Sequence, residues 1–147
     1  MQGYPHHYHT SAAGGNQGAV IVSSEGLPDL ETNAPPQFGG PEGVWSPETM
    51  LSAAVANCFI LSFRAIARAS KFEWKSLECH VEAVLDRPER AIYFTAFKLH
   101  ADLLVPAAAN NDMAQRLLEK AEQICLVSAS LKAVTTLTTN IRAEQAA

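Results

Sequence analysis

Residues 50–69 form the longest apolar run in the chain, and before position 64 only small polar side chains interrupt it. Three residues in front of the run carry helix-start signals, namely a capping hydroxyl, a proline and an acid: Ser46, Pro47 and Glu48. Each of these residue types is favoured at a helix N-terminus. We therefore predict a helix from about residue 47 to about residue 70. Because it is apolar on nearly all faces, it belongs in a protein interior.

Two short β-prone runs, residues 6–11 and 19–24, flank a glycine-rich turn signal at residues 14–18. This arrangement predicts a β-hairpin. Residues 26–43 follow, and they are rich in proline and glycine. That composition predicts an ordered but irregular loop.

A second hairpin is predicted after the long helix. Between residues 77 and 85 apolar and polar side chains alternate with period two, which is typical of a strand with one buried face. The turn lies at residues 86–90, and a returning strand covers residues 91–105.

The C-terminal third predicts one more helix and one more strand. Asn110 or Asn111 caps a helix from residue 112 to about 126, with apolar residues at the spacing of a single helical face. That stripe consists of Ala114, Leu117, Leu118, Ala121, Ile124 and Cys125. A threonine-rich strand covers residues 134–141. The order hairpin, helix, hairpin, helix, strand predicts an α+β fold in a single domain over residues 1–147.

Composition narrows the function classes. The chain has 147 residues, of which 48% are hydrophobic, and a net charge of −4 with 11 basic residues, so nucleic acid is not an expected partner. The apolar stretch at residues 55–66 is too short and too polar to span a bilayer, so no membrane association is expected. Three cysteines and an N-terminus without signal-peptide character predict a reducing, cytoplasmic location.

The three cysteines differ in their setting. Cys79 lies on the apolar face of its predicted strand and is interpreted as a core residue. Cys58 and Cys125, taken singly, would also be core residues. However, each lies on the buried surface of one of the two long helices, and helices in so small a domain are expected to touch. A dithiol buried in a cytoplasmic protein is more often redox-active than structural, although spacing alone leaves both uses open.

Several short segments of this chain match a known pattern: Gly43-Val44-Trp45-Ser46-Pro47-Glu48, Ala53-Ala54, Cys58-Phe59, Lys120-Ala121-Glu122 and Cys125-Leu126-Val127-Ser128. With them the sequence resembles the OsmC/Ohr family of osmotically inducible and organic hydroperoxide resistance proteins, over residues 38–141. The resemblance implies a curved antiparallel sheet with two central helices, in an intertwined homodimer with its active sites at the interface.

The resemblance also implies thiol peroxidase activity on organic hydroperoxides, with a dithiol reductant and no metal or other cofactor. By position, Cys58 would attack the peroxide, Cys125 would resolve the intermediate, and Glu48 would be the acidic partner. Two other functions stay open: a non-catalytic dimer of this fold that binds an apolar ligand, and a structural domain whose cysteines never meet.

The chain departs from the peroxidase pattern at three points. The first hairpin turn lacks the arginine that activates the thiol in the Ohr branch, and the first basic residue is Arg64. On an ideal helix Arg64 projects about 120° away from Cys58. Glu48 lies ten residues before Cys58, about 15 Å on a helix, so it needs a separate first turn or a dimer to reach that thiol. Otherwise it is only an N-terminal helix charge. Leu126 replaces a usual proline, which indicates an OsmC-like branch.

Three histidines near the N-terminus could suggest a metal site, since His7 and His9 would share one face of the first strand. We find no third ligand near them in the sequence. A partly exposed strand is therefore the preferred interpretation, and we predict no metal site.

Overall fold

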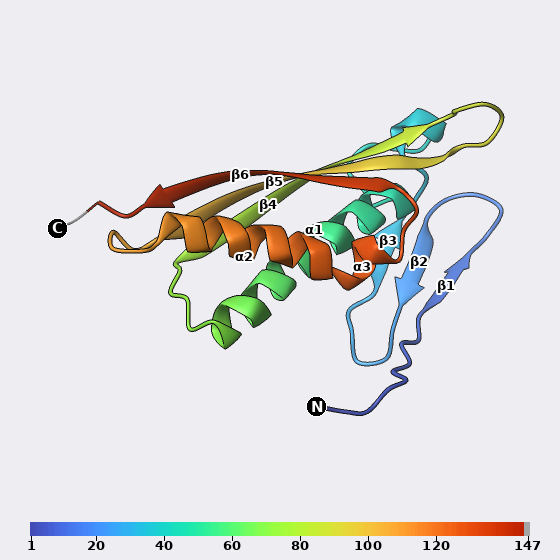
Figure 1. Cartoon of the computed structure of the whole chain (residues 1–147). Coiled ribbons are helices and arrows are strands. Elements are labelled where there is room, and N and C mark those ends of the chain that lie inside the picture. Colours follow the sequence, from blue (N-terminus) through green and yellow to red (C-terminus); the bar gives the residue numbers. More distant parts are fainter. Residues whose placement is uncertain (146–147) are drawn as a thin grey trace. The chain divides into compact units, whose positions relative to one another are not determined.

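The structure, a computed structural model, describes residues 1–145 and divides into two units, Met1–Met50 and Leu51–Ala147 (Figure 1). Each unit has its own three-stranded sheet. The single domain predicted for residues 1–147 stays a prediction.

The N-terminal unit is a small antiparallel sheet in the order β1-β2-β3. Strands β1 (Ser11–Gly14) and β2 (Val20–Ser23) form the predicted hairpin around the glycine-rich turn, in which Gly18 has φ = 86°. Only glycine adopts such a conformation readily. The third strand, β3 (Leu30–Thr32), pairs with β2, and a short 3-10 helix η1 (Pro36–Phe38) follows.

Two predictions for this unit were wrong in part. The first strand begins at Ser11, not at residue 6, because Ser11 already pairs with Ser23 at the end of β2 and the ladder stops there. The segment 26–43 is not wholly irregular, since it contains β3. A strand of three residues is too short to show alternation in the sequence.

The long helix α1 (Pro47–Ala69) is confirmed. At its start the Ser46 backbone N–H donates to Thr49 Oγ1 (2.9 Å), and the Thr49 N–H donates back to Ser46 Oγ (3.2 Å). These reciprocal bonds satisfy backbone donors that a helix start leaves free. The helix ends before Lys71, which has φ = 52°.

The C-terminal unit is built on β4 (Ser76–Asp86) and β5 (Tyr93–Val105), the predicted second hairpin. Helices α2 (Asn111–Ile124) and α3 (Leu126–Ala129) then lead to β6 (Val134–Ala143). The α+β fold class is confirmed. One pair, β5–β6, is parallel and not antiparallel, because the helical connection carries the chain back before β6 begins.

One face of this sheet packs on the helices and the other is polar. Figure 1 shows α1 and α2 on the same side of the sheet, and the core joins side chains of α1, β5 and α2. From α1 the core takes every fourth residue: Val55, Phe59, Phe63 and Ala67. From β5 it takes alternate residues, Phe97, Leu99, Ala101, Leu103 and Val105, which is the periodicity that buries one face of a strand.

Helix α1 is longer than the apolar stretch that the sequence suggested. By length and composition alone its 23 residues could cross a membrane, so the prediction that the stretch is too short does not hold for the whole helix. Its buried residues nevertheless pack against β5 and α2, as in a core helix. Other apolar side chains of α1, such as Leu51 and Ile60, are only partly buried, and Leu61 is 48% exposed.

Candidate functional site

Cys58 lies on α1 beside the stripe that anchors this helix in the core. Its neighbour Phe59 is fully buried, whereas Cys58 is half-buried. The sulfur lies 4.0 Å from Ser62 Oγ, one helical turn further along. The packing of α1 therefore fixes the direction of the thiol while leaving part of it open.

Cys125 lies where one helix ends and the next begins. It has φ = −60° and ψ = 111°, an extended conformation that separates α2 from α3, and its side chain is fully buried. Its carbonyl accepts hydrogen bonds from the Ser128 hydroxyl (3.3 Å) and the Ala129 N–H (3.0 Å). The helix predicted to reach about residue 126 therefore ends at Ile124, and a separate short helix follows. Of the predicted apolar stripe, Ile124 is exposed and Cys125 lies outside the helix.

The break has a chemical consequence. The first N–H groups of any helix have no partner within the helix, so they are free to bond elsewhere. In α3 these groups include the N–H of Leu126 and that of Val127, and both lower the pKa of the Cys58 thiol. The Cys125 side chain also lowers the pKa of Cys58. Cys58 and Cys125 therefore shift each other's pKa, and their pairing in one site stays a prediction.

These donors lower the pKa of Cys58. Burial raises the pKa of the thiol, but the Val127 N–H and the Cys125 thiol stabilise the thiolate. The Ser62 hydroxyl and the Leu126 N–H act in the same direction, and the pKa of Cys58 lies below its ordinary value. All four donors are neutral groups, so this arrangement does not depend on a cation.

The other two thiols are shifted the opposite way. Burial raises the pKa of Cys125, hydrogen bonds from Ser128 only partly offset this, and negative charge on Cys58 raises it further. Burial, with a smaller contribution from Cys125, raises the pKa of Cys79 to about 11. Of the three thiols, Cys58 alone therefore has a lowered pKa.

Glu48 lies in the first turn of α1, and the helix continues without a break through Cys58. The separate first turn that would carry Glu48 to Cys58 is thus not found. Among residues 1–145, Glu48 Oε2 is buried and has no hydrogen-bond partner. Glu48 also lines a cavity of about 460 Å³ within the N-terminal unit, together with apolar side chains such as Phe38 and Met50.

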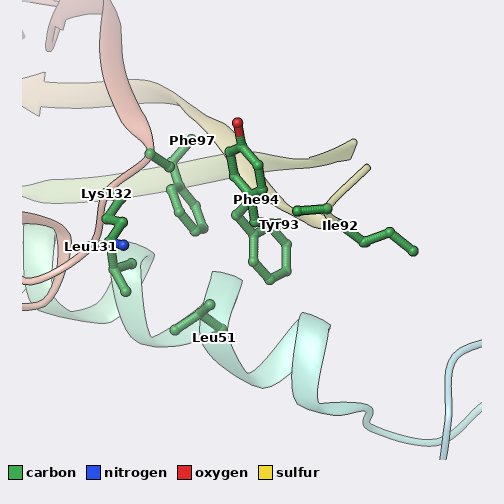
Figure 2. A pocket seen from close by; sticks show the side chains of 9 residues that line it. Leu51, Ile92, Tyr93, Phe94, Phe97, Leu131 and Lys132 are labelled. Atoms are coloured by element: carbon green, nitrogen blue, oxygen red, sulfur yellow. The ribbon is translucent and has the colours of Figure 1, made fainter. Parts of the chain in front are cut away.

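A larger cavity lies in the C-terminal unit (Figure 2). Its volume is about 660 Å³, within the range of small-molecule sites in proteins. Figure 2 shows Phe94 and Phe97 projecting from β5 toward Leu51 of α1, with Leu131 and Lys132 at one side. Leu51 and Cys58 are seven residues apart, so they lie on the same face of α1, about 10 Å apart along its axis.

Sequence reasoning missed the donors that serve Cys58. The only charged group of α1 that was weighed as an activator of the thiol is Arg64, which is exposed. Backbone N–H groups have no sequence motif of their own. The available signal was Ser128, three residues after Cys125, because its hydroxyl bonds to the Cys125 carbonyl at the start of the new helix.

The N-terminal histidines do not form the strand face predicted for them. His6, His7 and His9 are exposed and precede β1. The extended ladder that would have placed His7 and His9 side by side ends at Ser11.

Comparison with known proteins gives a consistent result. The family model described as OsmC-like protein matches residues 40–140. An organic hydroperoxide resistance protein of Xanthomonas axonopodis pv. citri is 27% identical over 118 residues, 80% of each chain. An OsmC-like protein of unknown function from Vibrio cholerae has a TM-score of 0.83 at 15% identity, over 94% of this chain and 100% of that chain.

A structure from Legionella pneumophila, described as an organic hydroperoxide resistance protein OsmC, has a TM-score of 0.74 at 25% identity, over 95% of this chain and 98% of that chain. The family match spans most of the sequence and includes both Cys58 and Cys125. The chain belongs to the OsmC-like protein family.

Proposed function

We propose that this protein is a cysteine-based peroxidase that reduces organic hydroperoxides in defence against oxidative stress. The observation that supports the proposal is the lowered pKa of Cys58, to which the Val127 N–H and the Cys125 side chain contribute. A thiolate is the form of cysteine that attacks peroxides. The family match, and relatives named organic hydroperoxide resistance proteins, support the same activity.

The proposed reaction uses each thiol once. The Cys58 thiolate attacks one oxygen of the hydroperoxide, the O–O bond breaks, and the leaving alkoxide takes a proton to become an alcohol. Cys58 is then a sulfenic acid. The Cys125 sulfur attacks it, an S–S bond forms and water leaves. An external dithiol reduces the disulfide by exchange and is itself oxidised to a disulfide.

The cavity beside α1 supports an organic substrate over hydrogen peroxide. Its lining is mostly apolar, with Leu51 on the same face of α1 as Cys58. Burial of an alkyl chain contributes about 0.8 kcal/mol per methylene group, and hydrogen peroxide has none. In this proposal the alkyl or aromatic part occupies the cavity while the peroxide group reaches Cys58.

The proposal includes a cytoplasmic homodimer and a role for Glu48. Because α1 is continuous, Glu48 would act on a thiol only across the dimer, where it would be the acidic partner. Its buried oxygen without a partner among residues 1–145 supports a contact with a donor from a second copy. If Glu48 is only a helix charge, Glu48→Gln will leave turnover unchanged.

Steady-state reduction of cumene hydroperoxide and tert-butyl hydroperoxide with a dithiol donor tests the activity. Cys58→Ser should abolish turnover. Cys125→Ser should consume about one equivalent of peroxide and leave a sulfenic acid on Cys58, which dimedone would trap. Cys79→Ser is the matched control and should keep turnover close to wild type. If Cys58→Ser retains the first equivalent and Cys125→Ser loses it, the two roles are reversed.

The absence of any lysine or arginine before Arg64 favours a second function. Without a cation near the thiol, the protein would be a non-catalytic dimer that holds an apolar ligand in the same cavity. Wild type would then consume none of the hydroperoxides, while an apolar fluorescent probe would still bind. Replacing Phe97 by alanine should weaken that binding.

A further inference from the structure

The polar face of the C-terminal sheet carries a cluster of side chains that the peroxidase proposal does not use. Glu78 and His80 lie on β4, and His100 and Asp102 lie on β5. In the antiparallel register His80 is opposite His100, and Glu78 is opposite Asp102. Residues two apart in a strand point to the same face, so these four side chains occupy one patch.

The distances within the patch fit a bound metal ion. His80 Nε2 lies 3.5 Å from Glu78 Oε2 and 3.9 Å from Asp102 Oδ2. One donor atom from each of these residues lies within 4.8 Å of the other two. Donors around a tetrahedral zinc ion with bonds of about 2.0–2.1 Å are separated by roughly 3.3 Å. Small side-chain rotations would therefore close the three donors on an ion.

Neighbouring side chains hold Asp102 in place. Asn140 donates to Asp102 Oδ1 (3.0 Å), and His100 Nε2 lies 3.5 Å from the same oxygen. His100 is in turn fixed by Thr138, whose Oγ1 is 2.7 Å from His100 Nδ1. Such partners orient the ligands of a metal and raise its affinity. Asp102 Oδ2 faces the ion position.

The charges also point to a cation. Glu78 and Asp102 are directly opposite each other, and like charges in that position destabilise a sheet. Two carboxylates would balance the charge of one divalent ion.

We infer that Glu78, His80 and Asp102 form a surface site for a divalent transition metal of the zinc type. One imidazole and two carboxylates are ligands that zinc accepts, and water completes the tetrahedron. The site links β4 to β5 and is separate from the thiols, which lie on the buried side of the sheet. The sequence shows no ligand spacing for it, because its residues meet only through strand register.

Calorimetric titration of the metal-free, full-length protein with zinc chloride tests the site. We expect one ion per chain, and a loss of affinity of about tenfold or more in His80→Asn and in Asp102→Asn. Glu82→Gln is the matched control, because Glu82 lies on the same strand face but outside the cluster, and it should bind as wild type does.

Other zinc ligands in the chain must be separated from this site. A variant with His6, His7 and His9 replaced by Asn, and one with Cys58 and Cys125 replaced by Ser, should both keep the binding. Zinc should also raise the melting temperature of wild type and leave that of His80→Asn unchanged. The His80 side chain is 66% exposed, so the substitution should not affect folding, which circular dichroism checks. Equal affinity in His80→Asn and wild type, or no binding up to millimolar zinc, would overturn the inference.

Discussion

At Leu126 the chain departs from the family pattern, and this departure changes the hydrogen-bond donors available to Cys58. Peroxidase relatives usually carry proline after the second cysteine, and proline has no N–H. Here the Leu126 N–H is one of the groups that stabilise the Cys58 thiolate. A leucine at this position thus adds a donor in a chain that lacks the activating arginine of the first hairpin turn.

Leu126→Pro tests this interpretation. Proline is favoured at the first position of a helix, and Cys125 already has the extended conformation that precedes proline. The substitution should therefore remove a donor without disturbing the backbone. We expect the pKa of Cys58 to rise and its reaction rate near neutral pH to fall by about three- to tenfold. Thiolate absorbance as a function of pH measures the pKa of Cys58, and stopped-flow alkylation measures its reaction rate.

Leu126→Ala is the control, because it shortens the exposed side chain but keeps the N–H. If alanine slows Cys58 as much as proline does, the leucine side chain is responsible and the N–H is not.

The three thiols should differ in reactivity, because only the thiolate reacts with an alkylating agent. The pKa of Cys79 is about 11, so at about pH 8 its thiolate fraction is roughly one in a thousand. The pKa of Cys58 is lowered, so its thiolate persists at a lower pH than an ordinary cysteine's. With limiting iodoacetamide, mass spectrometry should find the label on Cys58 first and on Cys79 last. Early labelling of Cys79 would contradict the pKa order.

At the scale of elements, the break between α2 and α3 gives Cys125 room to move. Its position at two helix ends lets the backbone shift with the loss of few hydrogen bonds, since helix termini have low local stability. All three cysteines are free in this structure. Closing a Cys58–Cys125 disulfide would require only a rearrangement of this short connection.

We expect mild peroxide treatment to form an intramolecular Cys58–Cys125 disulfide and to leave Cys79 free. Peptide mapping under non-reducing conditions would identify the linked fragments. Cys125→Ser should abolish the link and serves as the control. A disulfide between Cys79 and Cys125 would indicate that the strand cysteine is the resolving partner.

How far the sequence predicts the fold depends on the length of each element. The long helix, both hairpins and β6 were predictable, because each has a clear start signal or an apolar period over many residues. Strand β3 was not, since three residues cannot show a period. The parallel β5–β6 pairing and the break at Cys125 could not be predicted either, because both arise from tertiary contacts that leave no local sequence pattern.

The candidate site was predictable only in part. The sequence pattern placed Cys58 and Cys125 each on the apolar face of a predicted helix, and the family resemblance implied their roles. Val127 and Leu126 act through backbone N–H groups, so their side chains gave no signal. Glu78, His80 and Asp102 lie far apart in sequence across two strands, and only the register brings them together.

At the scale of the whole molecule, the open question is what covers the exposed side of α1. Helices that are apolar on all faces are normally buried. The core of the C-terminal unit takes one stripe of α1, whereas Leu61 remains 48% exposed. Only 22% of the most apolar 18-residue window of α1 is buried. Apolar surface left open over such a length is typical of an interface between protein chains.

We therefore expect a homodimer whose interface includes α1. Stable homodimers often bury 2,000 Å² or more of mainly apolar surface, in the range of about 2,000–5,000 Å². Sedimentation velocity at micromolar concentration should give a dimer for wild type. Leu61→Glu should shift the protein toward monomer, because it would place an unpaired charge in the apolar interface.

The control for this last prediction is Val134→Glu, at the start of β6, where the wild-type side chain is 66% exposed on a different element. The Val134→Glu variant should stay dimeric. Circular dichroism must show that Leu61→Glu is still folded, since a dimer that folds only on association would lose both properties together. A wild-type protein that sediments as a stable monomer at micromolar concentration would contradict the dimer. A monomer would also exclude the proposed role of Glu48 as acidic partner of a thiol in a second copy. Within one chain, α1 separates Glu48 and Cys58 by about 15 Å.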